Sequence, residues 1–236
     1  MQIESITHVG LHRKNNEDRF FVNVLDNERT LLIIADGMGG HAAGEIAAEL
    51  AVSSFKNYRP RRAADICAEL LDRMTSAREA VVERSLAVPA YQGMGTTLSA
   101  LMLVGRSAFW AHVGDTRIYR YHEGELITIT DDHTVAGKLL RDGKINREQA
   151  RVHPYSNVLT RCIGCQNHDP DSGLFQVAVG DCVLLSSDGL HDLIPESRIA
   201  AILSEGVPPG EKLAALLNAC LEAGGRDNIT AVIAAI

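Results

Sequence analysis

Several short apolar runs in the sequence end abruptly at an acidic residue. The three clearest are Leu31–Ala35 before Asp36, Phe109–Gly114 before Asp115, and Cys182–Ser187 before Asp188. Continuous apolar runs of this length predict buried strands, so each carboxylate is expected at the edge of a sheet. After the first run, the glycines that begin at Gly37 allow another group to approach the backbone closely, and a helical pattern starts at His41.

Two further strands have polar residues at their beginnings. Asn16-Glu17-Asp18 precedes the expected strand Arg19–Val24, and Asp227-Asn228 precedes the last strand, 229–236. A single acidic residue beside a strand is usually a turn or capping residue. Several carboxylates at strand ends fit a shared metal site better. Because the ligands are oxygens and no His or Cys cage is evident, magnesium or manganese is favoured over zinc.

The remaining pattern predicts further strands and helices. The other expected strands are Gln2–Val9, Leu98–Val104, Ser107–Val113, Arg117–Tyr121, Glu125–Thr130 and Leu174–Val179. The four strands between residues 98 and 130 follow one another too closely for crossover helices, so we expect antiparallel neighbours. Helical apolar stripes are Ala47, Ala51, Phe55 and Tyr58, then Ile66, Leu70, Met74, Ala77 and Val81, with further helices at Glu196–Ser204 and Glu211–Ala223.

Strands and helices occur in blocks rather than in alternation. This order predicts an α+β fold in which antiparallel β layers are covered by pairs of helices. With 236 residues and 46% hydrophobic content, we expect one domain over 1–236. The segment 133–164 is polar and irregular, with a short helix expected at Ala136–Asp142, and such a segment inside a compact domain is typical of a functional flap.

The formal charge of −7 argues against a general nucleic-acid or membrane-surface binder, which would need a basic face. No apolar run approaches the roughly 20 residues that span a bilayer, and Met1–Ser5 does not resemble a signal peptide. Five cysteines form an odd set without a disulfide framework, which favours a reducing cytoplasm. We interpret the CxxC spacing of Cys162 and Cys165 as coincidental, because no second CxxC or βαβ redox pattern accompanies it.

Carboxylates that hold two divalent ions can support phosphoryl chemistry. A hydroxide held between the two metals can attack phosphorus in line while the metals neutralise charge. Such a site also needs a planar cation to bind the phosphoryl oxygens. Arg13, just upstream of Glu17, is placed to be that clamp.

An ordered series of motifs carries a family resemblance. It consists of Gly10-x-x-Arg13-x-x-Asn16-Glu17-Asp18, Asp36-Gly37-Met38-Gly39-Gly40-His41, Gly95-Thr96-Thr97, Gly114-Asp115-Thr116-Arg117, Asp131-Asp132-His133-Thr134, Leu159-Thr160-Arg161, Ser187-Asp188-Gly189-Leu190 and Arg226-Asp227-Asn228-Ile229-Thr230. From about Gly10 to Thr230, the chain resembles the bacterial branch of the PP2C-type (PPM) metal-dependent serine/threonine protein phosphatases. The resemblance implies an αββα sandwich of two antiparallel sheets flanked by helix pairs, with a metal cleft at one end.

The resemblance also implies roles for individual residues. The bridging ligand of two Mn²⁺ or Mg²⁺ ions is Asp36, and the other metal ligands are the Gly37 carbonyl, Glu17, Asp188 and Asp227. A weaker third ion is implied at Asp115 with Asp188 and Asp192. Asp18 orients metal-bound water, Arg13 binds the phosphate, and the metal-bridging hydroxide attacks directly without a phosphoenzyme.

One departure from the family concerns the proton donor. Animal members carry a histidine where this chain has Met38, which cannot donate a proton. The leaving alkoxide then takes its proton from metal-bound water or from His41, which can equally be a helix-start residue.

Other polar motif residues have simpler interpretations. His133 is interpreted as a structural hydrogen-bonding group, as are His112 and His122. Asp131-Asp132 is expected to form a turn, and Gly95–Thr97 to support the sheet near the site. Arg161 and His153, in the flap, either contact the substrate or are solvated.

The expected function is therefore hydrolysis of phosphoserine and phosphothreonine in proteins. The expected partners are phosphorylated proteins, including a Ser/Thr kinase that the enzyme opposes, and the chain is expected to be a cytoplasmic monomer without nucleic-acid or membrane partners. Two alternatives remain, a phosphatase of small phosphate esters and a non-catalytic binding member. All four of Glu17, Asp36, Asp188 and Asp227 are present, which argues against the second. An ATPase is disfavoured because the chain lacks a P-loop.

Overall fold

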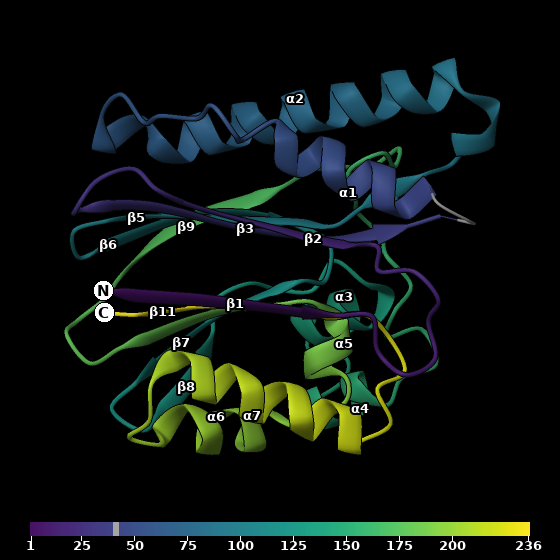
Figure 1. Cartoon of the computed structure of the whole chain (residues 1–236). Coiled ribbons are helices and arrows are strands. Elements are labelled where there is room, and N and C mark those ends of the chain that lie inside the picture. The colour runs from purple at the N-terminus through teal and green to yellow at the C-terminus, as the bar shows by residue number, and fades with distance from the viewer. Residues whose placement is uncertain (40–42) are drawn as a thin grey trace.

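The computed structural model describes residues 1–39 and 43–236. Two β-sheets lie face to face, with helices on both outer faces (Figure 1). The strands are β1 (Gln2–His8), β2 (Asp18–Val24), β3 (Arg29–Met38), β4 (Gly95–Thr96), β5 (Leu98–Val104), β6 (Ser107–Val113), β7 (Arg117–His122), β8 (Glu125–Thr128), β9 (Asp171–Gln176), β10 (Cys182–Ser186) and β11 (Ile229–Ala235). The helices are α1 (Ala43–Ser53), α2 (Ile66–Ala87), α3 (Val135–Arg141), α4 (Arg147–Arg151), α5 (Asp188–His191), α6 (Glu196–Ser204) and α7 (Pro209–Glu222), with single 3₁₀ turns at Ala63–Asp65 and Pro89–Tyr91.

Every strand pairing in the two sheets is antiparallel. One sheet has the order β1-β11-β10-β7-β8, and the other has the order β2-β3-β5-β6-β9, with β4 paired to β3. Helices α1 and α2 cover the second sheet, and α6 and α7 cover the first (Figure 1). The predicted α+β sandwich is therefore confirmed.

The continuous apolar run of β3 is explained by burial on both faces of its sheet. Leu31 and Ile33 pack outward against the α1 and α2 layer, while Leu32 and Ile34 pack inward against the other sheet. A strand that is covered on both sides needs no polar alternation. The five stripe positions of α2 are likewise all buried: Ile66, Leu70, Met74, Ala77 and Val81.

The prediction that the strands between residues 98 and 130 are all neighbours was wrong at one connection. β6 pairs with β5 and β9, whereas β7 pairs with β8 and β10 in the other sheet. The chain crosses between the sheets at Gly114, whose φ is +109° and where a Cβ would lie 2.5 Å from the Thr97 Cβ. Only glycine accepts both this backbone conformation and this close contact. The crossover places Asp115 between the sheets.

Several other element bounds differ from expectation. β3 continues to Met38 because Gly37 and Met38 pair with β4, and β9 begins at Asp171 because it pairs with β6. The short helix α5 directly after β10 was not predicted. The chain ends lie side by side, since β1 pairs with β11 (Figure 1).

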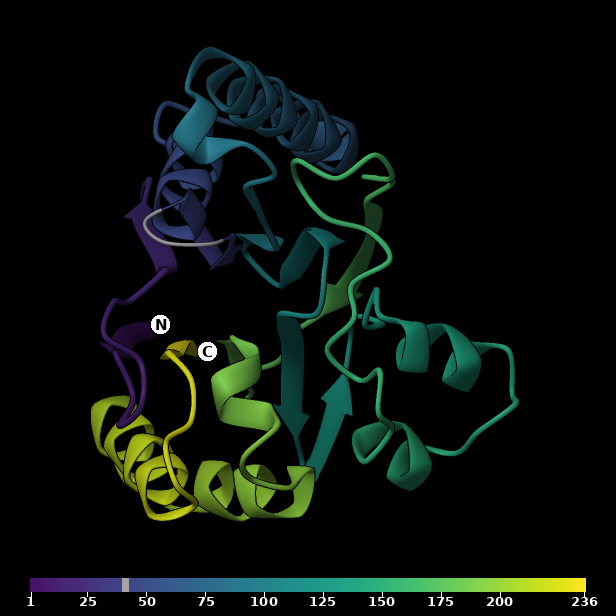
Figure 2. The ribbon, with the colours of Figure 1, turned by 90° about the vertical axis from the view of Figure 1, so that its right-hand side faces the viewer.

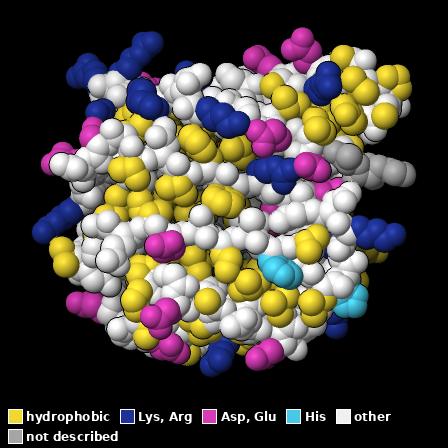
Figure 3. Space-filling view, in the orientation of Figure 1, with side chains coloured by type: hydrophobic (Ala, Val, Ile, Leu, Met, Phe, Trp, Pro, Cys, Tyr) yellow, Lys and Arg dark blue, Asp and Glu magenta, His cyan; other side chains and the backbone are white. Residues whose placement is uncertain are grey.

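The surface carries charges of both signs. On the face drawn in Figure 3, basic and acidic side chains are interspersed over the helices and sheet edges. None of the helices within residues 1–39 and 43–236 is both long and apolar enough to cross a membrane.

Candidate active site

A cavity of about 280 Å³ lies at one end of the sandwich, where both sheets deliver polar residues. Figure 2 looks at this end, with α5 between the layers and the flap helices α3 and α4 to one side. The lining residues are Arg13, Glu17, Asp36, Gly37, Met38, Gly39, Thr97, Asp115, Asn157, Leu159, Asp188, Asp227 and Asn228. The structure therefore brings together the predicted Arg13, Glu17, Asp36, Gly37, Asp115, Asp188 and Asp227.

Asp36 is held in place through its own backbone. Its N–H donates to Thr97 Oγ1 at 2.9 Å, and its carbonyl accepts from the Thr97 N–H at 2.9 Å. The Thr96 hydroxyl also donates to that carbonyl at 2.9 Å. These bonds leave the Asp36 carboxylate unconstrained by the sheet, and they confirm that Gly95–Thr97 supports the site.

Close backbone packing explains the glycines next to Asp36. A Cβ at Gly37 would lie 2.2 Å from the Gly44 carbonyl oxygen and 2.8 Å from the Glu17 carbonyl oxygen. A Cβ at Gly44 would lie 2.6 Å from Glu17 Oε2. The first turn of α1 thus packs directly against β3 and the Glu17 side chain, which is possible only without side chains at Gly37 and Gly44.

Asn228 fastens the N-terminal loop to the start of β11. Its Oδ1 accepts from the Glu17 N–H at 2.8 Å, and its Nδ2 donates to the carbonyls of Val9 and Asn15, each at 2.9 Å. A Cβ at Gly189 would lie 1.9 Å from the Asn228 carbonyl oxygen, so α5 packs closely on the same residue. One buried amide therefore fixes the positions from which Glu17, Asp188 and Asp227 project.

The electrostatics of the cluster are unfavourable for carboxylates alone. Burial, followed by repulsion from neighbouring carboxylates, raises the pKa of Asp188 to about 7 and the pKa values of Asp36 and Asp115 well above their usual range. A compensating charge is supplied by Arg13, which donates to Asp227 Oδ2 at 2.6 Å and has its pKa raised by this bond. A cation would relieve the repulsion.

An orphaned oxygen on the cavity also indicates that the carboxylates fit cations. Among the described residues, the buried Oδ1 atom of Asp188 has no hydrogen-bond partner, and neither has the buried Oδ1 atom of Asp18, which lies behind the cavity. Hard carboxylate oxygens of this kind are the ligands that Mg²⁺ and Mn²⁺ prefer. Within residues 1–39 and 43–236, however, no group of three or more His, Cys, Asp or Glu side chains is arranged, as it stands, to hold a metal ion.

Asp18 lies behind the cavity rather than on its wall. It is 3% exposed, faces Asp36 across the β2–β3 ladder, and accepts a hydrogen bond from Ser187 Oγ at 2.8 Å. Burial raises its pKa to about 6, although the Ser187 bond acts in the opposite direction. This position agrees with the expected indirect role.

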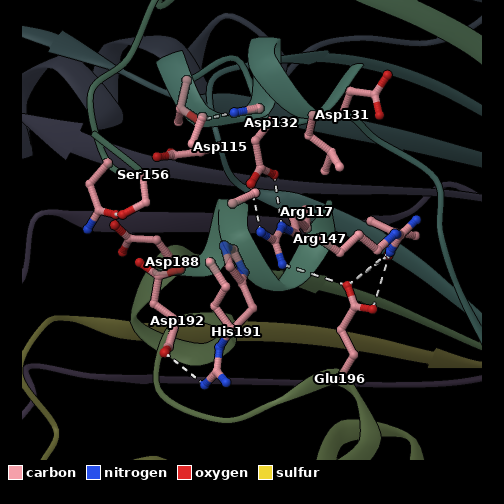
Figure 4. A pocket seen from close by; sticks show the side chains of 18 of the residues that line it. Asp115, Arg117, Asp131, Asp132, Arg147, Ser156, Asp188, His191, Asp192 and Glu196 are labelled. Carbon is pink, nitrogen blue, oxygen red and sulfur yellow. Dashed lines mark hydrogen bonds and ion pairs between the residues drawn. The ribbon is translucent and has the colours of Figure 1, made fainter. Parts of the chain in front are cut away.

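A second cavity of about 240 Å³ adjoins the first beneath the flap (Figure 4). The two share Asp115, Asn157 and Asp188, and the predicted Asp192 lines only the second. In its wall, Arg117 donates to both carboxylate oxygens of Asp132, at 2.6 and 2.8 Å. Asp132, interpreted from the sequence as part of a turn, thus also has a side-chain role that the sequence did not indicate, because its carboxylate holds the partly buried Arg117 guanidinium.

The remaining predicted residues have varied positions. His41 lies outside the described residues. Arg161 donates to Asp171 Oδ1 at 3.0 Å, and within the described chain neither Arg161 nor His153 lines either cavity. Sequence reasoning missed Asn157 and Leu159 as lining residues. Asn157 lies in an irregular flap loop outside the motifs, and in the motif Leu159-Thr160-Arg161 only Arg161 was considered for substrate contact.

His133 has the structural role that was expected. The ring Nδ1 of His133 accepts from the Gly114 N–H at 3.2 Å, and the backbone N–H of His133 donates to the Gly114 carbonyl at 2.7 Å. Its Nε2 pairs with Asp171 at 3.0 Å. Burial lowers its pKa, which favours the neutral ring that accepts from Gly114. The residue before Asp115 is thus held at both backbone groups. His112 and His122 are also hydrogen-bonded, to Ser99 and Asp181.

Cys162 and Cys165 depart from the sequence interpretation. Their sulfurs are joined in a disulfide, whereas Cys67, Cys182 and Cys220 are free. The CxxC spacing is therefore not coincidental in the structure. The pairing was missed because its basis is the local turn rather than a second motif.

Comparison with known proteins agrees with the geometry of the cavity. The family model described as protein phosphatase 2C matches residues 11–222. The chain is 37% identical over 239 residues to the protein phosphatase PhpP of Streptococcus pneumoniae, covering 99% of this chain and 96% of that protein. It is similar, at 32% identity and a TM-score of 0.91, to the serine/threonine phosphatase of S. agalactiae, covering 100% of this chain and 99% of the other.

The structure of a third relative contains bound metal ions. The catalytic domain of the serine/threonine protein phosphatase PstP, in complex with two manganese ions, is 32% identical with a TM-score of 0.86, covering 98% of this chain and 96% of the other. The family match and these full-length similarities show that the chain belongs to the protein phosphatase 2C family of serine/threonine protein phosphatases.

Proposed function

We propose that this phosphatase releases phosphate from phosphoserine and phosphothreonine in proteins at the cavity lined by Arg13, Glu17, Asp36, Asp188 and Asp227. The observation that carries the proposal is the convergence of partly buried carboxylates from both sheets beside one half-exposed guanidinium. The carboxylates suit divalent cations, and the guanidinium suits a phosphoryl group.

Metal dependence follows from the donor set. Asp36 is proposed as the shared ligand, with Glu17 and the Gly37 carbonyl on one side and Asp188 and Asp227 on the other. Asp115, Asp188 and Asp192 are proposed for a weaker third ion, and the ions are Mn²⁺ or Mg²⁺. When bound, divalent ions neutralise phosphoryl charge and lower the pKa of water. The manganese complex of the PstP relative supports this assignment.

Arg13 is proposed to grip the substrate phosphate. Its side chain is 53% exposed, and its partner Asp227 is 35% exposed, so both can exchange partners without unfolding the site. A guanidinium presents two N–H groups in a geometry that matches two phosphoryl oxygens. Arg13 therefore orients the phosphorus atom toward the carboxylate cluster.

Asp18 and the flap complete the proposed machinery. The unpartnered Oδ1 of Asp18 can accept a hydrogen bond from water and orient it behind Asp36. The leaving oxygen takes its proton from His41 or from water, because the Met38 thioether has no proton to give. The flap 133–164 contributes Asn157 and Leu159 to the cavity.

The wider setting is also proposed. Residues 1–236 form one phosphatase domain, which acts as a cytoplasmic monomer on phosphorylated proteins, including a Ser/Thr kinase that it opposes. Its acidic net charge supports the absence of nucleic-acid and anionic-membrane partners.

The test is phosphate release from a phosphothreonine peptide with Mn²⁺, and then with EDTA. We expect Mn²⁺-dependent release from the peptide that EDTA abolishes. p-Nitrophenyl phosphate, assayed in parallel, is the comparison for small esters. Turnover of the small ester alone, or release that survives EDTA, would overturn the proposal.

A further inference from the structure

The segment Cys162–Cys165 is folded so that its two sulfurs meet. The Cys165 N–H donates to the Cys162 carbonyl at 3.4 Å, which closes a four-residue turn. Gly164 occupies the third position with φ +93°, the conformation that a type II turn requires there. The two Cα atoms lie 5.1 Å apart, inside the range that a disulfide spans.

The two cysteines differ in access to solvent. Cys162 is fully buried, whereas Cys165 is half-buried at the surface of the turn. An incoming thiolate therefore reaches Cys165 Sγ, and Cys162 is the sulfur that leaves. The other cysteines are poor competitors, because burial raises the pKa of Cys67 and Cys182 and raises the pKa of Cys220 to about 12.

The turn is attached directly to the strand that supports Asp36. The Ile163 N–H donates to the Thr96 carbonyl at 2.9 Å, and the Thr96 N–H donates back to Ile163 at 3.0 Å. Thr96 in turn donates from its hydroxyl to the Asp36 carbonyl. Cys162 Sγ lies beside Gly95, 3.3 Å from where a Cβ would stand. Ile163 is therefore the one residue between the disulfide and Thr96, which contacts the Asp36 backbone.

We propose that Cys162 and Cys165 form a reversible redox site that exchanges with low-molecular-weight disulfides. In its oxidised form, the site stabilises β4, whose Thr96 supports Asp36. In the forward step the two protein thiols are oxidised and one molecule of a disulfide such as oxidised glutathione is reduced. One S–S bond forms between the cysteines, the S–S bond of the oxidant breaks, and the two thiol protons remain on the two released thiols. An added dithiol reverses the step.

The consequence for activity rests on the proposed metal site. The disulfide removes freedom from the turn that pairs with Thr96, so the oxidised protein holds the Asp36 backbone more rigidly. Reduction is expected to raise, several-fold, the Mn²⁺ concentration that half-saturates phosphate release. Formation of the Cys162–Cys165 disulfide itself can be tested without measuring phosphatase activity.

The first experiment measures the modification on the full chain. The protein is equilibrated in buffers of reduced and oxidised glutathione, quenched with acid, labelled with N-ethylmaleimide in denaturant, and mapped by mass spectrometry. We expect Cys162 and Cys165 to lose their labels together, while Cys67, Cys182 and Cys220 remain labelled. Persistent labelling of both in excess oxidised glutathione, or glutathione attached to one of them, would overturn the redox site.

The second experiment measures the coupling. Mn²⁺ titrations of phosphate release are compared between oxidised and reduced protein, with Cys165→Ser as the variant that cannot form the bond and Cys67→Ser as the matched control. The shift should persist in Cys67→Ser and vanish in Cys165→Ser. Identical titrations of fully oxidised and fully reduced wild type would refute the coupling, and absent phosphate release in both forms would instead refute the proposed function.

Discussion

Replacing Asp188 by Asn should stabilise the metal-free protein while destroying its response to Mn²⁺. The pKa of Asp188 rises from 3.8 to about 7 because the carboxylate is buried among other carboxylates. The difference of about 3 pKa units corresponds to about 4 kcal/mol, at about 1.4 kcal/mol per unit. Relaxation and water penetration reduce this figure, so it is a ceiling on the gain.

The sign of the pH dependence follows from the raised pKa. The folded state binds this proton more tightly than the unfolded chain does. The stabilising contribution is therefore fully present below the unfolded value near 3.8 and is lost as the pH rises through about 7. Metal-free wild type should lose free energy of unfolding over this window, and the Asn variant should lose less.

Urea unfolding in EDTA, repeated at pH 5, 6, 7 and 8, measures this difference, and the same titrations with Mn²⁺ measure the metal response. We expect the Asn variant to be more stable than wild type at pH 8 in EDTA. Mn²⁺ should stabilise wild type and have little effect on the variant. A variant that is less stable than wild type in EDTA, or that keeps the Mn²⁺ stabilisation, would refute the reasoning.

Three further substitutions test separate parts of the site. Arg13→Ala should mainly raise KM, lowering kcat/KM about 10- to 100-fold through lost charged hydrogen bonds; steady-state kinetics check this against exposed Arg61→Ala, and an unchanged KM contradicts the clamp. Gly114→Ala should lower the free energy of unfolding by about 1–3 kcal/mol because of its positive φ. The control is Gly206→Ala, where a Cβ meets open space; equal denaturant midpoints for the two variants would contradict the prediction. His133→Gln should weaken Mn²⁺ activation more than His133→Asn, whose oxygen can replace Nδ1; equal Mn²⁺ titrations contradict the hold on Gly114.

The order and type of most elements could be predicted because each has a local physical cause. The run Leu31–Ala35 is apolar at every position because its strand is buried on both faces. The stripe from Ile66 to Val81 is helical and entirely buried. The crossover at Gly114 could not be predicted, because a short Gly-Asp-Thr connection resembles a hairpin until the contact with Thr97 is known.

The site shows the same division between local and long-range causes. Asp36 and Asp188 could be identified because each ends an apolar run, and the structure places both on one cavity. Asn157 reaches that cavity only through the path of the flap, which has no periodic pattern to interpret. The Cys162–Cys165 pair was misjudged because the decisive feature is the turn around Gly164.

The most direct measurement is a calorimetric titration of Mn²⁺ into wild type and into Asp36→Asn, with phosphate release measured on the same samples. The proposed shared role of Asp36 predicts at least two bound ions in wild type, and loss of both high-affinity binding and phosphate release in the variant. High-affinity binding of both ions by an Asp36→Asn protein that still releases phosphate would contradict the assignment of this cavity as the metal centre.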